Sequence, residues 1–220
     1  MKKMKAVIFD MDGVIFDTEK LVLSSWKQVA GRRGVEGIEE VFLECVGTNT
    51  ASTIQTVQKH YGSNFPFDDF RKEATGIFQA TVKKNGMPVK PGVEELLSYL
   101  KNSGFKIGLA SSTRRAIVEE ELEMAGFLPY FEIVMGGDMI KNSKPDPEIF
   151  LTCCEKLGCK PEETIVIEDS HNGIRAASRA GMTSFMVPDL LPVTEEMENL
   201  SDRIFWNLSE VRDYLENNEI

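Results

Sequence analysis

The sequence predicts an α/β protein: a Rossmann-like core built on a parallel sheet, with an inserted α-helical cap domain. Two observations carry this prediction. From Pro91 onwards, short apolar runs alternate with stretches of helical length, the order of elements found in a parallel sheet covered on both faces. Before Pro91, one apolar run near the N-terminus is followed by a long region in which apolar residues recur at helical spacing.

The predicted strands are short and continuously apolar, because a strand buried on both faces carries hydrophobic residues in succession. They are expected at Ala6–Phe9, Lys106–Ala110, 132–135, 164–167 and 183–187. Helices are predicted between them at 92–100, 114–124, 147–158 and 174–180, and a glycine follows or closes each one. Asp146 is expected to cap the helix that begins at Pro147.

The helical region divides the chain. Residues 1–17 and 87–220 are predicted to form the core domain, and residues 18–86 a helical cap inserted after the first strand. Turn residues at Lys84-Asn85-Gly86 and Pro88 close the insertion.

Charge and composition exclude several classes of protein. The 220 residues carry 25 Lys and Arg against 35 Asp and Glu, a net charge of −10. Nucleic acids and anionic membrane surfaces are bound by clustered cations, so neither is expected as a partner. The acidic run 119–121 is interpreted as a solvated helix face. An acidic enzyme that acts on anions needs a local positive charge, which a bound metal would supply.

The sequence shows neither a membrane-spanning segment nor a signal peptide. No segment approaches the ~18–20 apolar residues of a membrane span, and Asp10 interrupts the N-terminal apolar run after four residues, where a signal peptide needs ~7 or more. The four cysteines lack zinc-site spacing and are interpreted as small buried hydrophobic residues. We therefore expect a cytoplasmic protein, and a monomer, since nothing in the pattern requires a partner chain.

Polar residues follow four of the predicted strands. Asp10 and Asp12 come after the first, and Ser111 and Ser112 after the second; Lys144 lies a little beyond the third, and Glu168 and Asp169 end the fourth. In open α/β sheets, ligands bind beyond the carboxyl ends of the strands. These side chains are therefore predicted to converge on one site.

The pair Asp10 and Asp12 has the spacing that phosphoryl chemistry needs. Two residues of extended chain cover roughly 6–7 Å and return to the same face, so the two carboxylates could flank a tetrahedral phosphoryl group. One could attack phosphorus while the other handles a proton. Taken alone, the pair fits solvated carboxylates at a strand end better than a catalytic pair, and it is the other strand-end residues that favour the catalytic interpretation.

Several carboxylates in one place repel one another unless a cation lies among them. Oxygen ligands from Asp10, the Asp12 backbone and Asp169 suit Mg²⁺, a hard ion that bridges carboxylates and phosphate. Ser111 could donate a hydrogen bond to a phosphoryl oxygen, and the Ser112 N–H could do the same. Lys144 could offset the negative charge of the phosphoryl group.

Four segments together resemble the haloacid dehalogenase superfamily. They are FDMDGV at 9–14, ASST at 110–113, SKPDPEIF at 143–150 and IEDS at 167–170, in the order of the superfamily's four motifs. The segments NGIRAA at 172–177 and AGM at 180–182 are similar to its subgroup of beta-phosphoglucomutase-like phosphatases and mutases. The resemblance covers the whole chain.

The resemblance implies a mechanism. Asp10 would form an aspartyl phosphate, and Asp12 would protonate the leaving oxygen and then activate water. Mg²⁺ would bind Asp10, the Asp12 carbonyl and Asp169, with Glu168 beside these ligands or occasionally binding the metal. Ser111, Ser112 and Lys144 would hold the phosphoryl group. The cap would close over a small phosphorylated metabolite, with a sugar phosphate as the leading expectation.

Two alternatives remain beside a phosphatase. One is a sugar phosphomutase of the beta-phosphoglucomutase type, but this chain departs from that pattern at two cap positions. Val22 stands where mutases carry a histidine, and Thr50 where they carry a phosphate-binding arginine. The other alternative is a non-catalytic protein that binds phosphorylated metabolites, which the intact set of carboxylates and lysine disfavours.

Overall fold

The computed structural model describes residues 3–48 and 50–218, so the ends of the predicted core domain and Asn49 of the cap lie outside the described residues. In the described part, six strands form one parallel sheet in the order β3-β2-β1-β4-β5-β6. They are β1 (Ala6–Phe9), β2 (Lys106–Ala110), β3 (Ile133–Met135), β4 (Thr164–Glu168), β5 (Thr183–Met186) and β6 (Arg203–Ile204). This order confirms the predicted α/β class.

Ten α-helices accompany the sheet over the described ranges. Four follow β1 directly and lie in the predicted insertion: α1 (Thr18–Arg33), α2 (Ile38–Cys45), α3 (Thr50–Tyr61) and α4 (Phe67–Asn85). The others are α5 (Val93–Asn102), α6 (Arg115–Met124), α7 (Glu148–Lys156), α8 (His171–Arg179), α9 (Glu195–Leu200) and α10 (Leu208–Asn218). None of the described helices is both long and apolar enough to cross a membrane.

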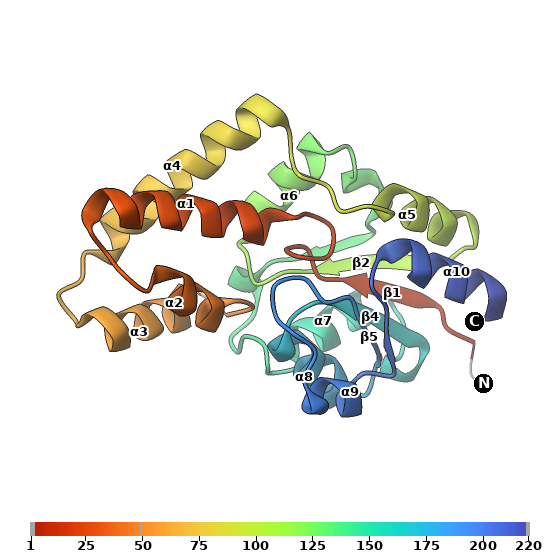
Figure 1. Cartoon of the computed structure of the whole chain (residues 1–220). Coiled ribbons are helices and arrows are strands. Elements are labelled where there is room, and N and C mark those ends of the chain that lie inside the picture. Colours follow the sequence, from red (N-terminus) through yellow and green to blue (C-terminus); the bar gives the residue numbers. More distant parts are fainter. Residues whose placement is uncertain (1–2, 49, 219–220) are drawn as a thin grey trace.

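The sheet is covered on both faces, as its apolar strands require (Figure 1). In β1, Val7 and Phe9 face the cluster formed with α5, α6 and α10, while Ala6 and Ile8 face the cluster formed with α7 and α8. All four side chains are fully buried. Because side chains alternate across a strand, β1 contributes to both layers of the core. It lies inside the sheet, between β2 and β4.

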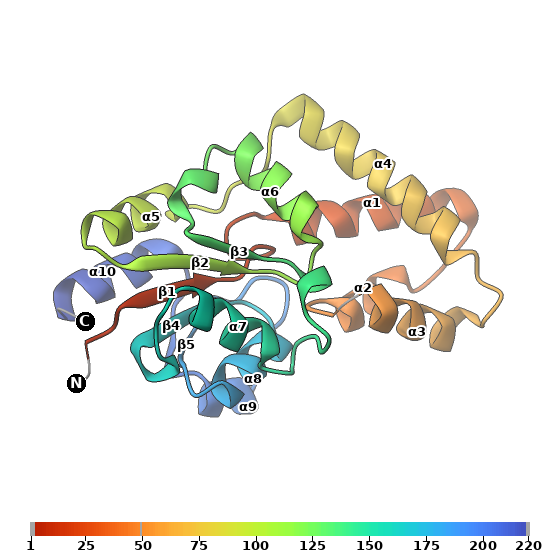
Figure 2. The same ribbon diagram turned by 180° about the vertical axis from the view of Figure 1, so that it is seen from behind.

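Helices α1–α4, called the cap below, form a separate group beside the sheet (Figures 1 and 2). Their own hydrophobic cluster is centred on Trp26, whose ring packs edge-on against Phe42 and Phe70 at centroid distances of 5.2 and 5.5 Å. The buried residues of this cluster all lie between residues 26 and 74. The cap therefore has its own small core, and its boundaries at residues 18 and 86 stay a prediction.

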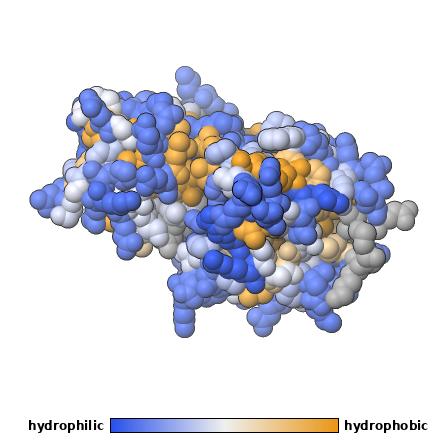
Figure 3. Space-filling model, turned by 60° about the horizontal axis from the view of Figure 1, so that its bottom comes forward, coloured by the Kyte–Doolittle hydropathy of each residue, from blue (hydrophilic) through white to orange (hydrophobic). Residues whose placement is uncertain are grey.

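Two chain segments connect the cap to the core, and they run side by side. Asp17 N–H donates to Pro88 O at 2.7 Å, and Lys90 N–H donates to Ile15 O at 2.9 Å. Phe16 pairs with Val89 in an antiparallel bridge. Figure 3 shows a mostly hydrophilic surface, with apolar residues visible where the cap meets the core.

Several predicted elements differ locally from the structure, and β6, α8 and α7 are examples. The strand β6 is missing from the sequence interpretation, because two residues are too short for any periodicity. Helix α8 begins at His171 rather than Ile174, since the Ser170 hydroxyl caps it by accepting from Gly173 N–H at 3.0 Å. Helix α7 begins one residue later than predicted, and Asp146 still accepts from the Glu148 N–H at 3.0 Å.

Candidate active site

The strand-end residues lie together, because β1 is flanked by β2 and β4 in parallel register. Asp10 follows β1, and its N–H donates to Ile167 O of β4 at 2.9 Å. Ser111 follows β2, while Glu168 and Asp169 lie at the end of β4. All four are buried. The sheet order thus brings together residues that are more than a hundred positions apart.

Lys144 joins two of these carboxylates. Its ammonium donates to Asp10 Oδ1 at 2.5 Å, to Glu168 Oε1 at 2.8 Å and to Ala110 O at 3.0 Å, which uses all three of its N–H bonds. Burial acts to lower the pKa of Lys144, but the charges of Asp10 and Glu168 outweigh it, so the net pKa is raised. The lysine is therefore a permanent cation at the base of the site.

Glu168 is engaged through both carboxylate oxygens. Oε1 accepts from Lys144, and Oε2 accepts from Ser170 N–H at 2.6 Å. The first turn of α8 leans directly against this side chain, since a Cβ on Gly173 would lie 1.7 Å from Glu168 Oε1. This arrangement makes Glu168 a support for Lys144 and for the start of α8.

Asp12 is oriented by two hydroxyl groups from opposite sides. Thr18 at the start of α1 donates to Oδ1 at 2.5 Å, and Thr113 after β2 donates to Oδ2 at 3.2 Å. Burial raises the pKa of the Asp12 carboxyl, while these two hydrogen bonds act to lower it. Asp12 thus has its own set of partners, separate from those of Asp10.

Three carboxylates form a candidate metal site. Asp10, Glu168 and Asp169 each offer an oxygen, and these oxygens lie within 4.8 Å of one another. Gly13 leaves room for them, because a Cβ there would lie 2.3 Å from Asp169 Oδ2. Burial, followed by the charge of Glu168, raises the pKa of Asp169 well above its usual value. Burial also raises the pKa of Asp10 to about 7 despite Lys144. Such crowded, buried oxygens fit a hard divalent cation.

The segment after β2 provides polar groups near Asp10. Ser111 is buried, and its Oγ accepts from Thr113 N–H at 3.0 Å, so its hydroxyl proton remains available to a ligand. Ser112 lies in the loop three residues before α6 begins. Its carbonyl is packed so closely on Gly137 that a Cβ there would lie 2.3 Å away.

The cap contributes groups that the sequence interpretation missed. A Cβ on Gly47 would lie 2.8 Å from the Ser170 side chain, so the α2–α3 loop touches the core next to Asp169. Glu19, in the first turn of α1, has a buried Oε2 without a hydrogen-bond partner among the described residues. Burial, then the charges of Asp12 and Asp10, raises its pKa to about 9. The acidic first turn of a helix was the available signal, but it equally fits simple dipole stabilisation.

The other residues singled out in the sequence have different surroundings. Val22 packs against the hydrophobic cluster of the cap, and Thr50 is exposed at the start of α3. The interpretation of the run 119–121 as a solvated face is wrong for Glu121, which is half-buried. Burial, followed by the charge of Asp12, raises its pKa to about 8.

All four cysteines are free thiols, and Cys45, Cys153 and Cys154 are buried.

Comparisons with known proteins agree with this geometry. Residues 7–187 match the family model described as "Haloacid dehalogenase-like hydrolase". A phosphorylated carbohydrates phosphatase of Thermotoga maritima is 35% identical over 183 residues, which cover 81% of this chain and 82% of the relative. A beta-phosphoglucomutase of Bacillus subtilis is 31% identical, with 81% of each chain covered. The crystal structure of beta-phosphoglucomutase from Clostridium difficile has a TM-score of 0.80 at 26% identity, covering 97% of this chain and 96% of that one.

Proposed function

This chain belongs to the haloacid dehalogenase-like hydrolases and is a phosphoric monoester hydrolase of that family, and we propose that it is a Mg²⁺-dependent sugar phosphate phosphatase acting through an aspartyl phosphate. The observation that carries the proposal is that Asp10 and Asp12 have different hydrogen-bond partners. Asp10 is bound to Lys144, whereas Asp12 is held separately by Thr18 and Thr113.

In the first step, a carboxylate oxygen of Asp10 attacks phosphorus, and the bond from phosphorus to the leaving oxygen breaks. Asp12 donates its proton to that oxygen, so the sugar leaves as a neutral alcohol. In the second step, Asp12 takes a proton from a water molecule as that water attacks the phosphorus of the aspartyl phosphate. Inorganic phosphate leaves, and Asp10 returns as a carboxylate.

Asp10, Asp169 and the Asp12 carbonyl would hold the Mg²⁺, and Glu168 would act mainly through Lys144 and α8, because both of its oxygens already have partners. Bound Mg²⁺ supplies positive charge for the phosphoryl oxygens. The Ser111 hydroxyl and the Ser112 N–H would donate to the same oxygens, and Lys144 would balance their charge from its place beside Asp10.

The names of the relatives support a phosphorylated sugar as substrate. Two positions in the cap favour hydrolysis over intramolecular transfer. Val22 packs into the apolar cluster of the cap, and Thr50 is exposed, so neither offers the imidazole or the guanidinium that a mutase uses to turn a bisphosphate around.

The test measures phosphate release from a panel of sugar phosphates, nucleotides and small phosphorylated acids, with Mg²⁺ and with a chelator. We expect Mg²⁺-dependent turnover of at least one sugar phosphate, lowered on the order of 10⁴-fold in Asp10→Asn. Asp68→Asn is the matched control, because this carboxylate on the cap is 86% exposed. Activity that survives Asp10→Asn, or that persists with the chelator, would overturn the proposal. Isomer interconversion without phosphate release would establish the mutase instead.

A further inference from the structure

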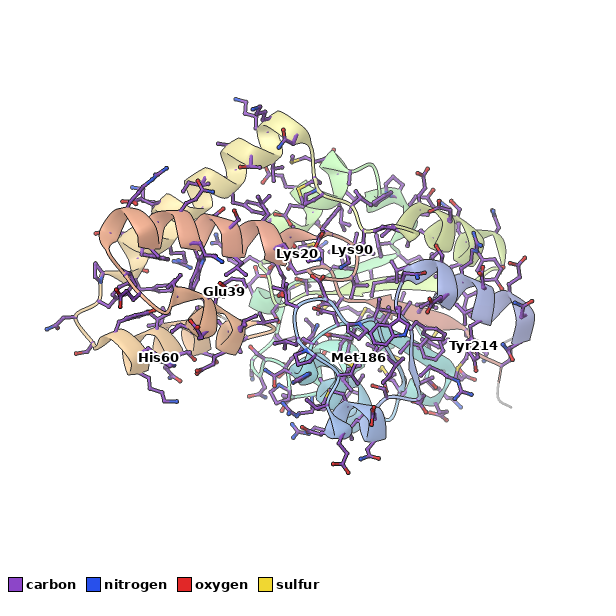
Figure 4. All side chains as sticks on the ribbon, viewed as in Figure 1. Lys20, Glu39, His60, Lys90, Met186 and Tyr214 are labelled. Carbon is purple, nitrogen blue, oxygen red and sulfur yellow. The ribbon has the colours of Figure 1, made fainter. Side chains whose placement is uncertain are left out.

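A buried aspartate lies in the core loop that follows β5. The Asp189 side chain is only 2% exposed, and its Oδ1 accepts hydrogen bonds from Lys20 Nζ and Lys90 Nζ, each at 2.8 Å. Figure 4 shows the two lysines close together where α1 meets the core. A single carboxylate oxygen therefore accepts hydrogen bonds from two ammonium groups.

The two lysines come from the two segments that connect the cap to the core. Lys20 lies in the first turn of α1, and Lys90 lies in the return segment between α4 and α5. Lys20 also approaches Asp17 Oδ1 at 3.0 Å. Since Lys90 N–H donates to Ile15 O, the backbones of the same two segments are bonded as well. Asp189 thus ties both connections to one point of the core.

The loop that carries Asp189 contacts both the core and the cap. His171 at the start of α8 pairs its Nε2 with Pro192 O at 2.9 Å, which holds the loop from the core side. Leu190 and Leu191, directly after Asp189, pack against the hydrophobic cluster of the cap. The loop therefore connects the core to the cap, and Asp189 supplies its ion pairs with Lys20 and Lys90.

Lys20 follows Thr18 by two positions in the same helical turn, and Thr18 donates to Asp12. The two residues share the backbone of one helical turn, so a bond that restrains Lys20 also restrains the backbone position from which the Thr18 hydroxyl reaches Asp12. Exposed ion pairs contribute little, but here the Asp189 carboxylate is buried and the Lys90 side chain is only 16% exposed, while the Lys20 side chain is 53% exposed.

We propose that Asp189 is a positioning residue for the phosphatase reaction: through Lys20 and Lys90 it holds the first turn of α1 so that Thr18 orients Asp12. This inference rests on the proposed function, because it assigns Asp189 a part in proton transfer by Asp12. Asp189 itself touches neither Asp10 nor Asp12 through any hydrogen bond of the described residues, and it acts through the cap connections.

The kinetic test is a double-variant cycle. We expect Asp189→Asn and Thr18→Val each to lower kcat about 10-fold, with KM changed less than about 3-fold, since binding of the phosphoryl group is untouched. Because both changes remove the same orientation of Asp12, the double variant should be no slower than the slower single variant. Lys27→Gln breaks the exposed Lys27–Glu39 pair further along α1 and should retain wild-type rates. Wild-type kcat in Asp189→Asn, or multiplicative losses in the double variant, would overturn the proposal.

A second measurement needs no turnover. Hydrogen exchange of backbone amides in residues 14–24 should be at least about 10-fold faster in Asp189→Asn than in the wild type, and unchanged in Lys27→Gln. Lys20→Gln and Lys90→Gln, which leave the buried carboxylate in place, should show smaller increases in the same segment. If the wild type releases no phosphate, the proposed function fails while this exchange experiment still decides the positioning of α1. Unchanged exchange in Asp189→Asn would refute it.

Discussion

Lys144 is the residue on which the charge balance of the site depends. It is the partner of Asp10 and of Glu168, and all three side chains are buried. A buried ion pair is a poor source of net stability, but removing one partner strands the other charges in a low-dielectric interior. We therefore expect the cation to be needed for folding, in addition to its proposed part in holding phosphate.

Lys144→Met should test this at the level of stability. It leaves two buried carboxylates without their cation, so we expect the free energy of unfolding to fall by about 3–5 kcal/mol. Urea unfolding with a chelator present would measure it. Lys5→Met is the control, because the lysine of the Lys5–Glu163 pair is 57% exposed and its removal should cost far less stability than the loss of Lys144. Equal losses in the two variants would contradict the assignment.

Glu19 is expected to make the stability of the metal-free protein depend on pH. Its folded-state pKa is raised to about 9 by burial and by the charges of Asp12 and Asp10, and burial raises that of Asp10 to about 7. The unfolded chain releases these protons near pH 4–4.5, so the folded state holds more protons between about pH 4 and 9. Stability from this source is fully present below about pH 4 and is lost as pH rises through 7 to 9.

We therefore expect the chelated protein to have a lower Tm at pH 8.5 than at pH 6, and Mg²⁺ to raise Tm more at pH 8.5. Calorimetry at both pH values, with and without Mg²⁺, measures this. Glu19→Gln should flatten the dependence, whereas Glu39→Gln, an exposed residue of α2, should not. A Tm of the chelated protein that rises with pH would disprove the assignment.

At the scale of elements, α8 shows how a helix and a strand end are fitted together. Ser170 caps the helix, and its third residue, Gly173, lies against the Glu168 carboxylate. The sequence predicted this helix from its apolar residues, which begin at Ile174. Its polar first turn was missed, because only the contact with Glu168 explains why a glycine is needed there.

Gly173→Ala should therefore be strongly destabilising. Its Cβ would lie 1.7 Å from Glu168 Oε1, so either α8 or the Glu168–Lys144 pair must move. We expect a loss of about 2–4 kcal/mol in urea unfolding, with weaker Mg²⁺ binding. Gly76→Ala in α4 is the matched control, since nothing lies within 4 Å of its Cβ position and alanine should stabilise by about 0.5–1 kcal/mol. Similar effects at both glycines would refute the packing argument.

At the scale of the whole molecule, the cap and the core have separate hydrophobic clusters. The largest core cluster includes buried residues from β1 and from α5, α6 and α10, and none from residues 18–86. The two connections to the cap are bonded to each other through Asp17 N–H and Pro88 O. These features favour the predicted division at residues 18 and 86 without testing it.

Excision of the cap would test that division. A short Gly-Ser loop from Asp17 to Pro88 should close without strain, because the two residues are already hydrogen-bonded. We expect the shortened chain to unfold cooperatively and to bind Mg²⁺, but to lose discrimination among phosphorylated substrates. Circular dichroism, Mg²⁺ titration and the phosphate-release panel would measure the three properties. A chain that fails to fold would show that the cap belongs to the core.

The sequence by itself determined which residues could do chemistry and roughly where the sheet would be. Continuous apolar runs mark β1, β2 and β4, and Asp10, Ser111 and Asp169 follow those runs directly, so local order along the chain was sufficient. The residues themselves suggested a proton-handling carboxylate and a charge-balancing Lys144, and the family resemblance then implied which carboxylate, Asp12, handles the proton and what Glu168 does.

The tertiary structure decided the partnerships. Lys144 meets Glu168, Thr18 meets Asp12, and Asp189 meets both Lys20 and Lys90. Several of these contacts join residues far apart in the chain, and they depend on the sheet order and on how the cap connections pass over the loop after β5. Periodicity and composition describe neighbours along the chain, whereas burial and pairing of charge arise only when distant segments exclude water from each other.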